Sequence, residues 1–166
     1  MTGEQWRAWA ARIAVVVAAV LVFIALSRLW SFANTDDPDL VEEGAIARTA
    51  ASACATMRDS AAAAAVATTA PLPQRVGAIN AQNDAVIELV TTMNRLGEER
   101  LEADQPSAQW LEDWQRLVSV RDAYAISLAA GKPKPMAIPT IDGRGLVERL
   151  NNVGLNCLVP LVLLAP

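Results

Sequence analysis

The feature that most constrains this chain is an unbroken apolar run, IAVVVAAVLVFIAL, from Ile13 to Leu26. With its flanks the run extends from Trp9 to Trp30, and as a helix it would be about 31 Å long, which matches the hydrocarbon core of a bilayer. Tryptophans and arginines stand at both ends, where membrane helices place their interfacial side chains: Trp6, Trp9, Arg12, Arg28 and Trp30. The sequence therefore predicts one transmembrane helix, with the lipid bilayer as a partner.

The charges on either side of the run predict its orientation. Two arginines and one glutamate precede it, whereas five acidic residues stand between positions 36 and 43. The positive-inside rule then places the N-terminus in the cytoplasm and the bulk of the chain outside the plasma membrane. A cleaved signal peptide is the alternative, because Ser31 and Ala33 have the spacing that signal peptidase accepts. Arg28 and Trp30 interrupt that pattern, so an uncleaved signal anchor is favoured.

The composition of the 166-residue chain excludes several functions. It contains no histidine, which rules out Ser-His-Asp triads, Cys-His pairs and zinc sites that use histidine. Its 18 acidic residues outnumber its 14 basic ones, and without a basic stripe the chain is not expected to bind nucleic acid. We expect no catalytic, metal-binding or cofactor-binding residues, and we do not expect an enzyme.

Two cysteines, Cys54 and Cys157, both follow the apolar run. An even pair in an oxidising compartment predicts a disulfide. A two-thiolate half metal site and two free buried thiols are the alternatives, but two ligands cannot complete a tetrahedral zinc site. We therefore expect a structural disulfide that closes a long loop.

Apolar spacing predicts an all-α fold. Residues 1–32 are assigned to a cytoplasmic tail and the transmembrane signal anchor, 33–39 to a linker, and 40–166 to an extracytoplasmic helical bundle with an apolar tail. Apolar residues at steps of three and four predict three long helices, over residues 39–67, 73–102 and 106–130. A short helix is predicted over 143–153, capped by Asp142, after an extended, polyproline-like crossing at 132–140. The disulfide would close this bundle.

Two polar residues interrupt predicted core faces. Asn83 lies within the apolar stripe of the second long helix, and residues 80–84 form the most polar patch on any predicted helix. Asn83 is more often a satisfied core group than a ligand contact. Arg121 is predicted to form a buried or rim salt bridge, with Asp84 or Asp142 as its partner, and an anion clamp is its functional alternative.

The chain ends in an apolar tail, LVPLVLLAP, which is too short to span a bilayer. Its possible partner-binding residues are Leu158, Val159, Leu161, Val162, Leu163 and Leu164. The tail either packs on its own bundle, which is slightly favoured, or docks on another subunit. Pro160 prevents a clean helical continuation and predicts an extended path.

The third long helix and the residues after it carry a resemblance. Trp110, Trp114, Leu117, Arg121-Asp122, Tyr124-Ala125 and Gly131, followed by a proline-rich crossing and Cys157, resemble small actinobacterial envelope proteins anchored by a helix or a lipid. The resemblance covers about residues 46–160. It implies a membrane-anchored, disulfide-closed helical ectodomain and no particular activity.

These observations predict a non-catalytic membrane-anchored interaction module, an accessory or scaffolding subunit that binds other subunits of an envelope or membrane complex. The alternative is an extracytoplasmic sensor or small-ligand-binding bundle that uses residues 80–84 and Arg121. An enzyme that uses Glu112 and Asp113 is the weakest hypothesis, because adjacent helical residues point about 100° apart and do not form a dyad.

Overall fold

The computed structural model describes residues 17–18, 20–26, 40–41 and 43–164, and it divides into two units, Met1–Asp37 and Pro38–Pro166. In the first unit, residues 17–18 and 20–26 are helical. Their large apolar side chains are exposed, from 48% for Ile24 to 74% for Phe23. Within these described ranges, no helix is both long and apolar enough to cross a membrane. The rest of the predicted span lies outside them, together with the predicted linker and the predicted interfacial residues Trp6, Trp9, Arg12, Arg28 and Trp30.

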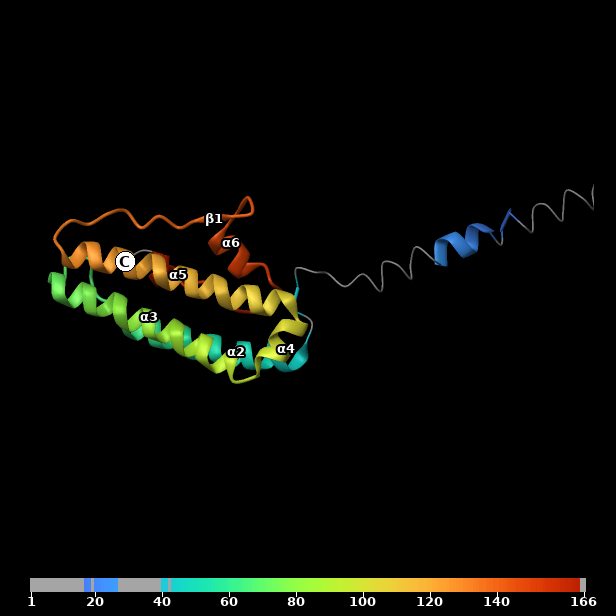
Figure 1. Cartoon of the computed structure of the whole chain (residues 1–166), viewed down its shortest axis with the longest axis horizontal. Coiled ribbons are helices and arrows are strands. Elements are labelled where there is room, and N and C mark those ends of the chain that lie inside the picture. The colour runs from blue at the N-terminus through green and yellow to red at the C-terminus, as the bar shows by residue number, and fades with distance from the viewer. Residues whose placement is uncertain (1–16, 19, 27–39, 42, 165–166) are drawn as a thin grey trace, which may run out of the picture. The chain divides into compact units, whose positions relative to one another are not determined.

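The second unit is a helical bundle (Figure 1). In chain order its elements are α2 (Gly44–Ala63), α3 (Leu72–Asn94), α4 (Glu98–Ala103), α5 (Gln105–Ala129), β1 (Thr140–Ile141), β2 (Arg144–Gly145), α6 (Leu146–Asn151) and α7 (Leu161–Leu164). Helix α3 packs against both α2 and α5, while α6 packs on α5 and α7 on α2. The prediction of an all-α fold is confirmed in that the structure is mostly helical, whereas the two-stranded sheet of β1 and β2 was not predicted.

The apolar stripe from which helix α2 was predicted is buried in the structure. Its fully buried residues are spaced at steps of four, four, three and four, and none is more than 1% exposed: Ile46, Ala50, Cys54, Met57 and Ala61. Most of these side chains are small, so the backbone of α3 can approach closely. The helix is shorter than the predicted range of 39–67, because it begins at Gly44 and ends at Ala63.

The prediction of one continuous helix over residues 73–102 is wrong. Helix α3 ends at Asn94, and Gly97 has a φ of +96° before the short helix α4 begins. Only glycine adopts this backbone conformation without strain, so Gly97 allows the chain to turn there. The turn brings Leu101 of α4 into the core at 5% exposure.

Helix α5 is the longest helix of the bundle and agrees with the predicted range of 106–130 to within one residue. Trp110 and Trp114 are 1% and 0% exposed, and their rings meet edge to face at 6.0 Å. The helix ends in a Schellman motif, in which the N–H of Lys132 bonds to the carbonyl of Ser127 and that of Gly131 to Leu128. Gly131 has the positive φ, 68°, that this motif requires.

Residues 132–139 form neither helix nor strand and run back along α5 (Figure 1). The chain then makes a two-stranded antiparallel hairpin, in which Thr140 pairs with Gly145. Asp142 and Gly143, at φ 50° and 79°, form its two-residue turn, as expected of the Asp-Gly pair that favours such turns. The prediction that Asp142 caps a helix from 143 to 153 is therefore wrong, because α6 begins only at Leu146 and ends at Asn151.

Candidate functional site

The predicted polar residues Asn83 and Arg121 meet inside the bundle, where α3 lies against α5. Arg121 is 0% exposed, and its Nε donates a hydrogen bond to Oδ1 of Asn83 at 2.7 Å. Its two terminal nitrogens donate to the side-chain oxygen of Gln82 and to the backbone carbonyl of Leu163. One guanidinium thereby joins α3, α5 and the C-terminal tail.

The counter-ion of Arg121 differs from the prediction. In the described part of the chain no carboxylate lies within ion-pair distance of Arg121, so the predicted salt bridge to Asp84 or Asp142 is absent. Asp142 instead lies 3.7 Å from Arg149. Burial lowers the pKa of the Arg121 guanidinium from its ordinary value to about 10, and the charge of Asp122 opposes this shift. The guanidinium therefore stays protonated at neutral pH, held by neutral oxygens.

Asn83 connects this buried cation to a carboxylate. Its Nδ2 donates a hydrogen bond to Oδ1 of Asp122 at 2.6 Å, and the residue is 2% exposed. In the polar patch at residues 80–84, only Gln82 and Asn83 are buried, whereas Asn80 and Asp84 are exposed. The patch thus contributes two amides to the interior, both of which hydrogen bond to groups of the chain itself.

The C-terminal tail packs on its own bundle, which is the local packing favoured by the sequence. Leu163 is 0% and Val159 7% exposed, and both belong to the main core. The N–H of Val159 donates to the side chain of Asn151 at 2.9 Å. Of the other predicted partner-binding residues, Val162 and Leu164 are partly buried, whereas Leu158 is 56% and Leu161 80% exposed.

The tail follows the predicted extended path only as far as Pro160, because a short helix follows it. The chain has no helix from residue 152 to 160, and then makes the single turn of α7 after Pro160. Proline is tolerated at this point because the first N–H groups of a helix have no partner within it. The N–H of Leu163 donates to the carbonyl of Pro160 at 3.0 Å.

The predicted disulfide joins Cys54 of α2 to Cys157 at the start of the tail. Their Cα atoms are 5.6 Å apart, both residues are 0% exposed, and 103 positions separate them in the sequence. The described residues include no free cysteine. Because α2 and the tail lie at opposite ends of the bundle's sequence, this bond ties the beginning of the fold to its end.

Asp113 is a second buried ionic group, and its structural role was not predicted from the sequence. Asp113 is 2% exposed and accepts from Arg116 at 2.6 Å and from Arg149 of α6 at 2.7 Å. Arg116 also holds Glu112 at 3.0 Å. The two adjacent carboxylates are therefore bound to arginines. Arg116 lies three residues after Asp113 on the same helix, so this pair could be predicted from the sequence. Arg149 lies 36 positions away, and its pairing with Asp113 could not.

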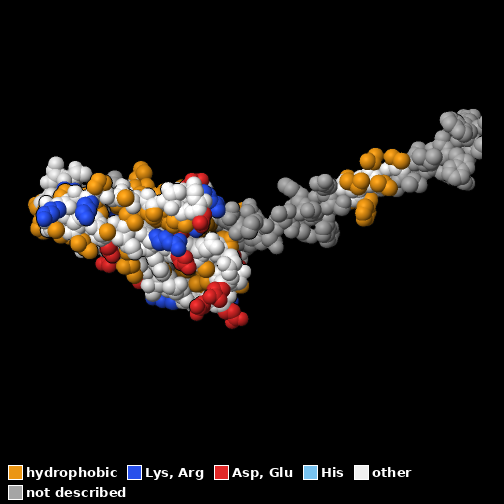
Figure 2. Space-filling model, turned by 45° about the horizontal axis from the view of Figure 1, so that its top comes forward, with side chains coloured by type: hydrophobic (Ala, Val, Ile, Leu, Met, Phe, Trp, Pro, Cys, Tyr) orange, Lys and Arg blue, Asp and Glu red, His pale blue; other side chains and the backbone are white. Residues whose placement is uncertain are grey.

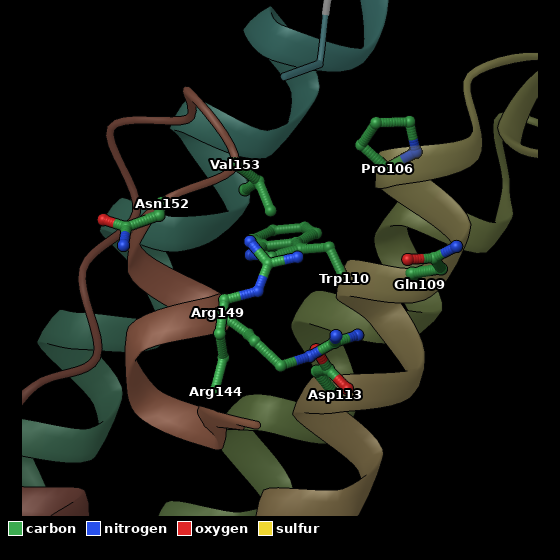
Figure 3. Close-up of a pocket in the computed structure, with 8 residues that line it drawn as sticks. All are labelled: Pro106, Gln109, Trp110, Asp113, Arg144, Arg149, Asn152 and Val153. Carbon is green, nitrogen blue, oxygen red and sulfur yellow. The ribbon is translucent and has the colours of Figure 1, made fainter. Parts of the chain in front are cut away.

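A small cavity adjoins Asp113 where α5, β2 and α6 meet. Figure 3 shows Arg149 reaching from α6 toward Asp113, with Trp110 at the side of the cavity. The volume of about 40 Å³ is enough for little more than one water molecule. Trp110 donates its indole N–H to the carbonyl of Leu150 at 3.2 Å, which fixes α6 on α5. The side chains around this cavity therefore pack α6 against α5.

An open groove of about 420 Å³ lies between the end of α3, α4 and α5. Its floor is apolar, with Leu101 and Leu111 at 5% and 4% exposure. Glu98, Glu102 and Glu112 stand around it. We call it the acidic groove. Across the described residues, no cluster of three or more His, Cys, Asp or Glu side chains could hold a metal ion.

The chain was compared with protein-family models, with curated proteins and with solved structures. None of the three comparisons finds a match.

Proposed function

We propose that this chain is a non-catalytic, membrane-anchored interaction module, an accessory or scaffolding subunit of a larger envelope or membrane complex. The observation that carries the anchor is the exposure of helical residues 17–18 and 20–26, whose large apolar side chains are 48–74% exposed. These residues belong to the apolar run that begins at Ile13. Apolar helical surface of this kind is stable in lipid and costly in water.

The buried charges of the bundle support a role without catalysis. Arg121 and Asp113 are occupied by side chains and carbonyls of the chain itself. A catalytic group has to reach a substrate, whereas these two groups hold helices and the tail together. For the same reason the ligand-binding alternative gains no support from Arg121 and Asn83.

The disulfide supports a location outside the cytoplasm. Cys54 and Cys157 are paired, and structural disulfides form and persist in oxidising compartments. The proposed topology therefore has a cytoplasmic N-terminus, one membrane helix and an extracytoplasmic bundle that meets other subunits.

The anchor is tested by placing charge inside it. Leu21→Arg with Val22→Arg should move the full chain from the membrane fraction to the soluble fraction, because each arginine at a bilayer centre costs roughly 2.5–3.5 kcal/mol on insertion scales. Ile126→Arg is the matched control, since Ile126 is 71% exposed on the bundle, and it should leave the fractionation unchanged. A doubly substituted chain that still resists carbonate extraction would contradict the anchor.

The topology and the subunit role need separate measurements. A membrane-impermeant protease added to intact cells should cleave near Thr35 and leave Thr2 protected. Purification of the full chain in mild detergent, followed by quantitative mass spectrometry, should recover a second protein at a fixed stoichiometry. A purified monomer that retains a small molecule would favour the ligand-binding alternative instead.

A further inference from the structure

The acidic groove carries negative charge that the chain does not neutralise. Glu98 and Glu102 stand one turn apart on α4, where like charges repel each other. Within the described ranges neither residue has an ion-pair partner, whereas Glu112 is paired with Arg116. An apolar floor with two unpaired carboxylates beside it matches a segment that combines basic and apolar side chains.

The chain itself contains such a segment. Its two lysines, Lys132 and Lys134, alternate with Pro133 and Pro135 and are followed by Met136. The first four of these residues are exposed, Met136 is partly buried, and all five lie outside any helix or strand. Prolines restrict the conformations of such a segment, so that little entropy is lost when a partner binds it. We call residues 132–136 the lysine segment.

The groove and the lysine segment cannot meet within one molecule. Glu98 and Glu102 come just before α5, and the lysines come just after it. Helix α5 has 25 residues, and at about 1.5 Å per residue it separates its two ends by roughly 37 Å. α4 and the start of residues 132–139 lie at opposite ends of the bundle in Figure 1, and acidic groups gather toward the α4 end in Figure 2.

We propose that the acidic groove of one copy receives the lysine segment of a second copy. Lys132 and Lys134 pair with Glu98 and Glu102, and Met136 enters the groove beside Leu101 and Leu111. Methionine suits such a floor because its unbranched side chain adapts to irregular surfaces. The two contacting surfaces differ, so the association is head to tail and forms a ring or an open chain.

The contact is small, and its strength depends on how copies are held. A groove of this size buries less surface than a stable interface of about 1,200–2,000 Å² needs, so the contact is weak between copies free in solution. Confinement of anchored copies in one bilayer raises their effective concentration. This part of the inference rests on the proposed membrane anchor, whereas the pairing of groove and lysine segment does not.

A charge exchange tests the pairing. A photo-crosslinking amino acid at Met136 of the full chain in liposomes should give a dimer crosslinked at residues 101–111 of the other copy. Lys132→Glu with Lys134→Glu, or Glu98→Lys with Glu102→Lys, should each lower the dimer yield by at least about fivefold. A mixture of the two variants, and a single chain with all four substitutions, should restore the yield. Salt at about 0.5 M should weaken the crosslink, because it screens exposed charges.

The same charges also complement the dipole of α5, with acids near its N-terminus and bases after its C-terminus. If that were their only role, the four-substitution chain would be the least stable variant and would not regain the dimer. Glu88→Lys is the matched control, because Glu88 is an exposed acid on α3 outside the groove, and it should leave the dimer yield unchanged. Equal yields in all variants, or no rescue, would overturn the inference.

Flotation of the liposomes separates this inference from the proposed function. If the chain floats with the lipid but gives no dimer, only the self-association fails. If the chain does not float, the anchor fails, and the same crosslinking experiment in concentrated detergent solution still decides the pairing.

Discussion

Asn83 and Arg121 are joined at 2.7 Å by a hydrogen bond from the guanidinium Nε to the amide oxygen. The amide nitrogen of Asn83 donates in turn to Asp122 at 2.6 Å. One buried amide thus links a cation inside the bundle to a carboxylate at its surface. The orientation of the amide is set by these two partners, because an exchange of its oxygen and nitrogen would break both bonds. The residue that interrupts the apolar stripe of α3 is therefore a satisfied core group.

Arg121→Met should lower the free energy of unfolding by about 2–4 kcal/mol, because it leaves the buried oxygens of Gln82, Asn83 and Leu163 without a donor. Chemical denaturation with the circular dichroism of the full chain in detergent checks the value. Arg95→Met is the control, since the Arg95 side chain is 68% exposed, and it should change stability by less than about 0.5 kcal/mol. Equal effects of the two substitutions would contradict the role of Arg121.

The pKa of Arg121 predicts how the difference in stability between the natural chain and Arg121→Met depends on pH. The pKa in the folded chain is about 10, below the ordinary value of a guanidinium in the unfolded chain. Up to about pH 9 Arg121 is protonated in both states, so it adds no pH dependence. Between these two pKa values the unfolded chain binds more protons, and the contribution of Arg121 to the free energy of unfolding rises with pH. The stability difference between the natural chain and Arg121→Met should therefore be constant from about pH 6 to pH 9.

The sequence predicted the features that depend on local spacing. The boundaries of α5 follow from its apolar periodicity and from Gly131 and Pro133 after it. The disulfide follows from an isolated pair of cysteines. Gly97 was missed as a break, because it is a single glycine between two residues that favour helix, Leu96 and Glu98.

The partners of the buried charges could not be predicted in the same way. Arg121 donates to a backbone carbonyl of the tail, 42 positions away, and every residue supplies such a carbonyl. Asp113 pairs with Arg149 only because the hairpin at Asp142 and Gly143 turns α6 onto α5. Long-range packing selects these partners, so periodicity indicates which residues are buried but not what they contact.

Asp113→Asn should lower the free energy of unfolding by about 1.5–3 kcal/mol, because it weakens two charge-assisted bonds at a buried site. Its neighbour provides a matched control. The Glu112 side chain is 62% exposed, and Glu112→Gln should change stability by less than about 0.5 kcal/mol. Hydrogen exchange should also rise in α6 in the Asp113 variant alone. Unchanged protection of α6 would show that Arg149 does not hold it in place.

Replacing both cysteines, Cys54→Ala with Cys157→Ala, should lower the free energy of unfolding by about 4–5 kcal/mol. The bond closes a loop of 103 positions, and the chain-entropy model gives a loss of this size when such a loop is opened. Helix content at low temperature should change little, because the helices still bury the same stripes. Reduction of the native chain by dithiothreitol should be slow, since both cysteines are 0% exposed. Rapid reduction without denaturant would contradict this packing.

The tail contains a matched pair of leucines two positions apart. Leu163 is 0% exposed in the main core, whereas Leu161 is 80% exposed. Leu163→Ala should lower the free energy of unfolding by about 2–5 kcal/mol, the cost of truncating a buried leucine, and Leu161→Ala should change it by less than about 0.5 kcal/mol. Denaturation of both variants beside the natural chain measures the difference. Equal small effects would mean that the tail leaves the bundle in solution and is available to a partner.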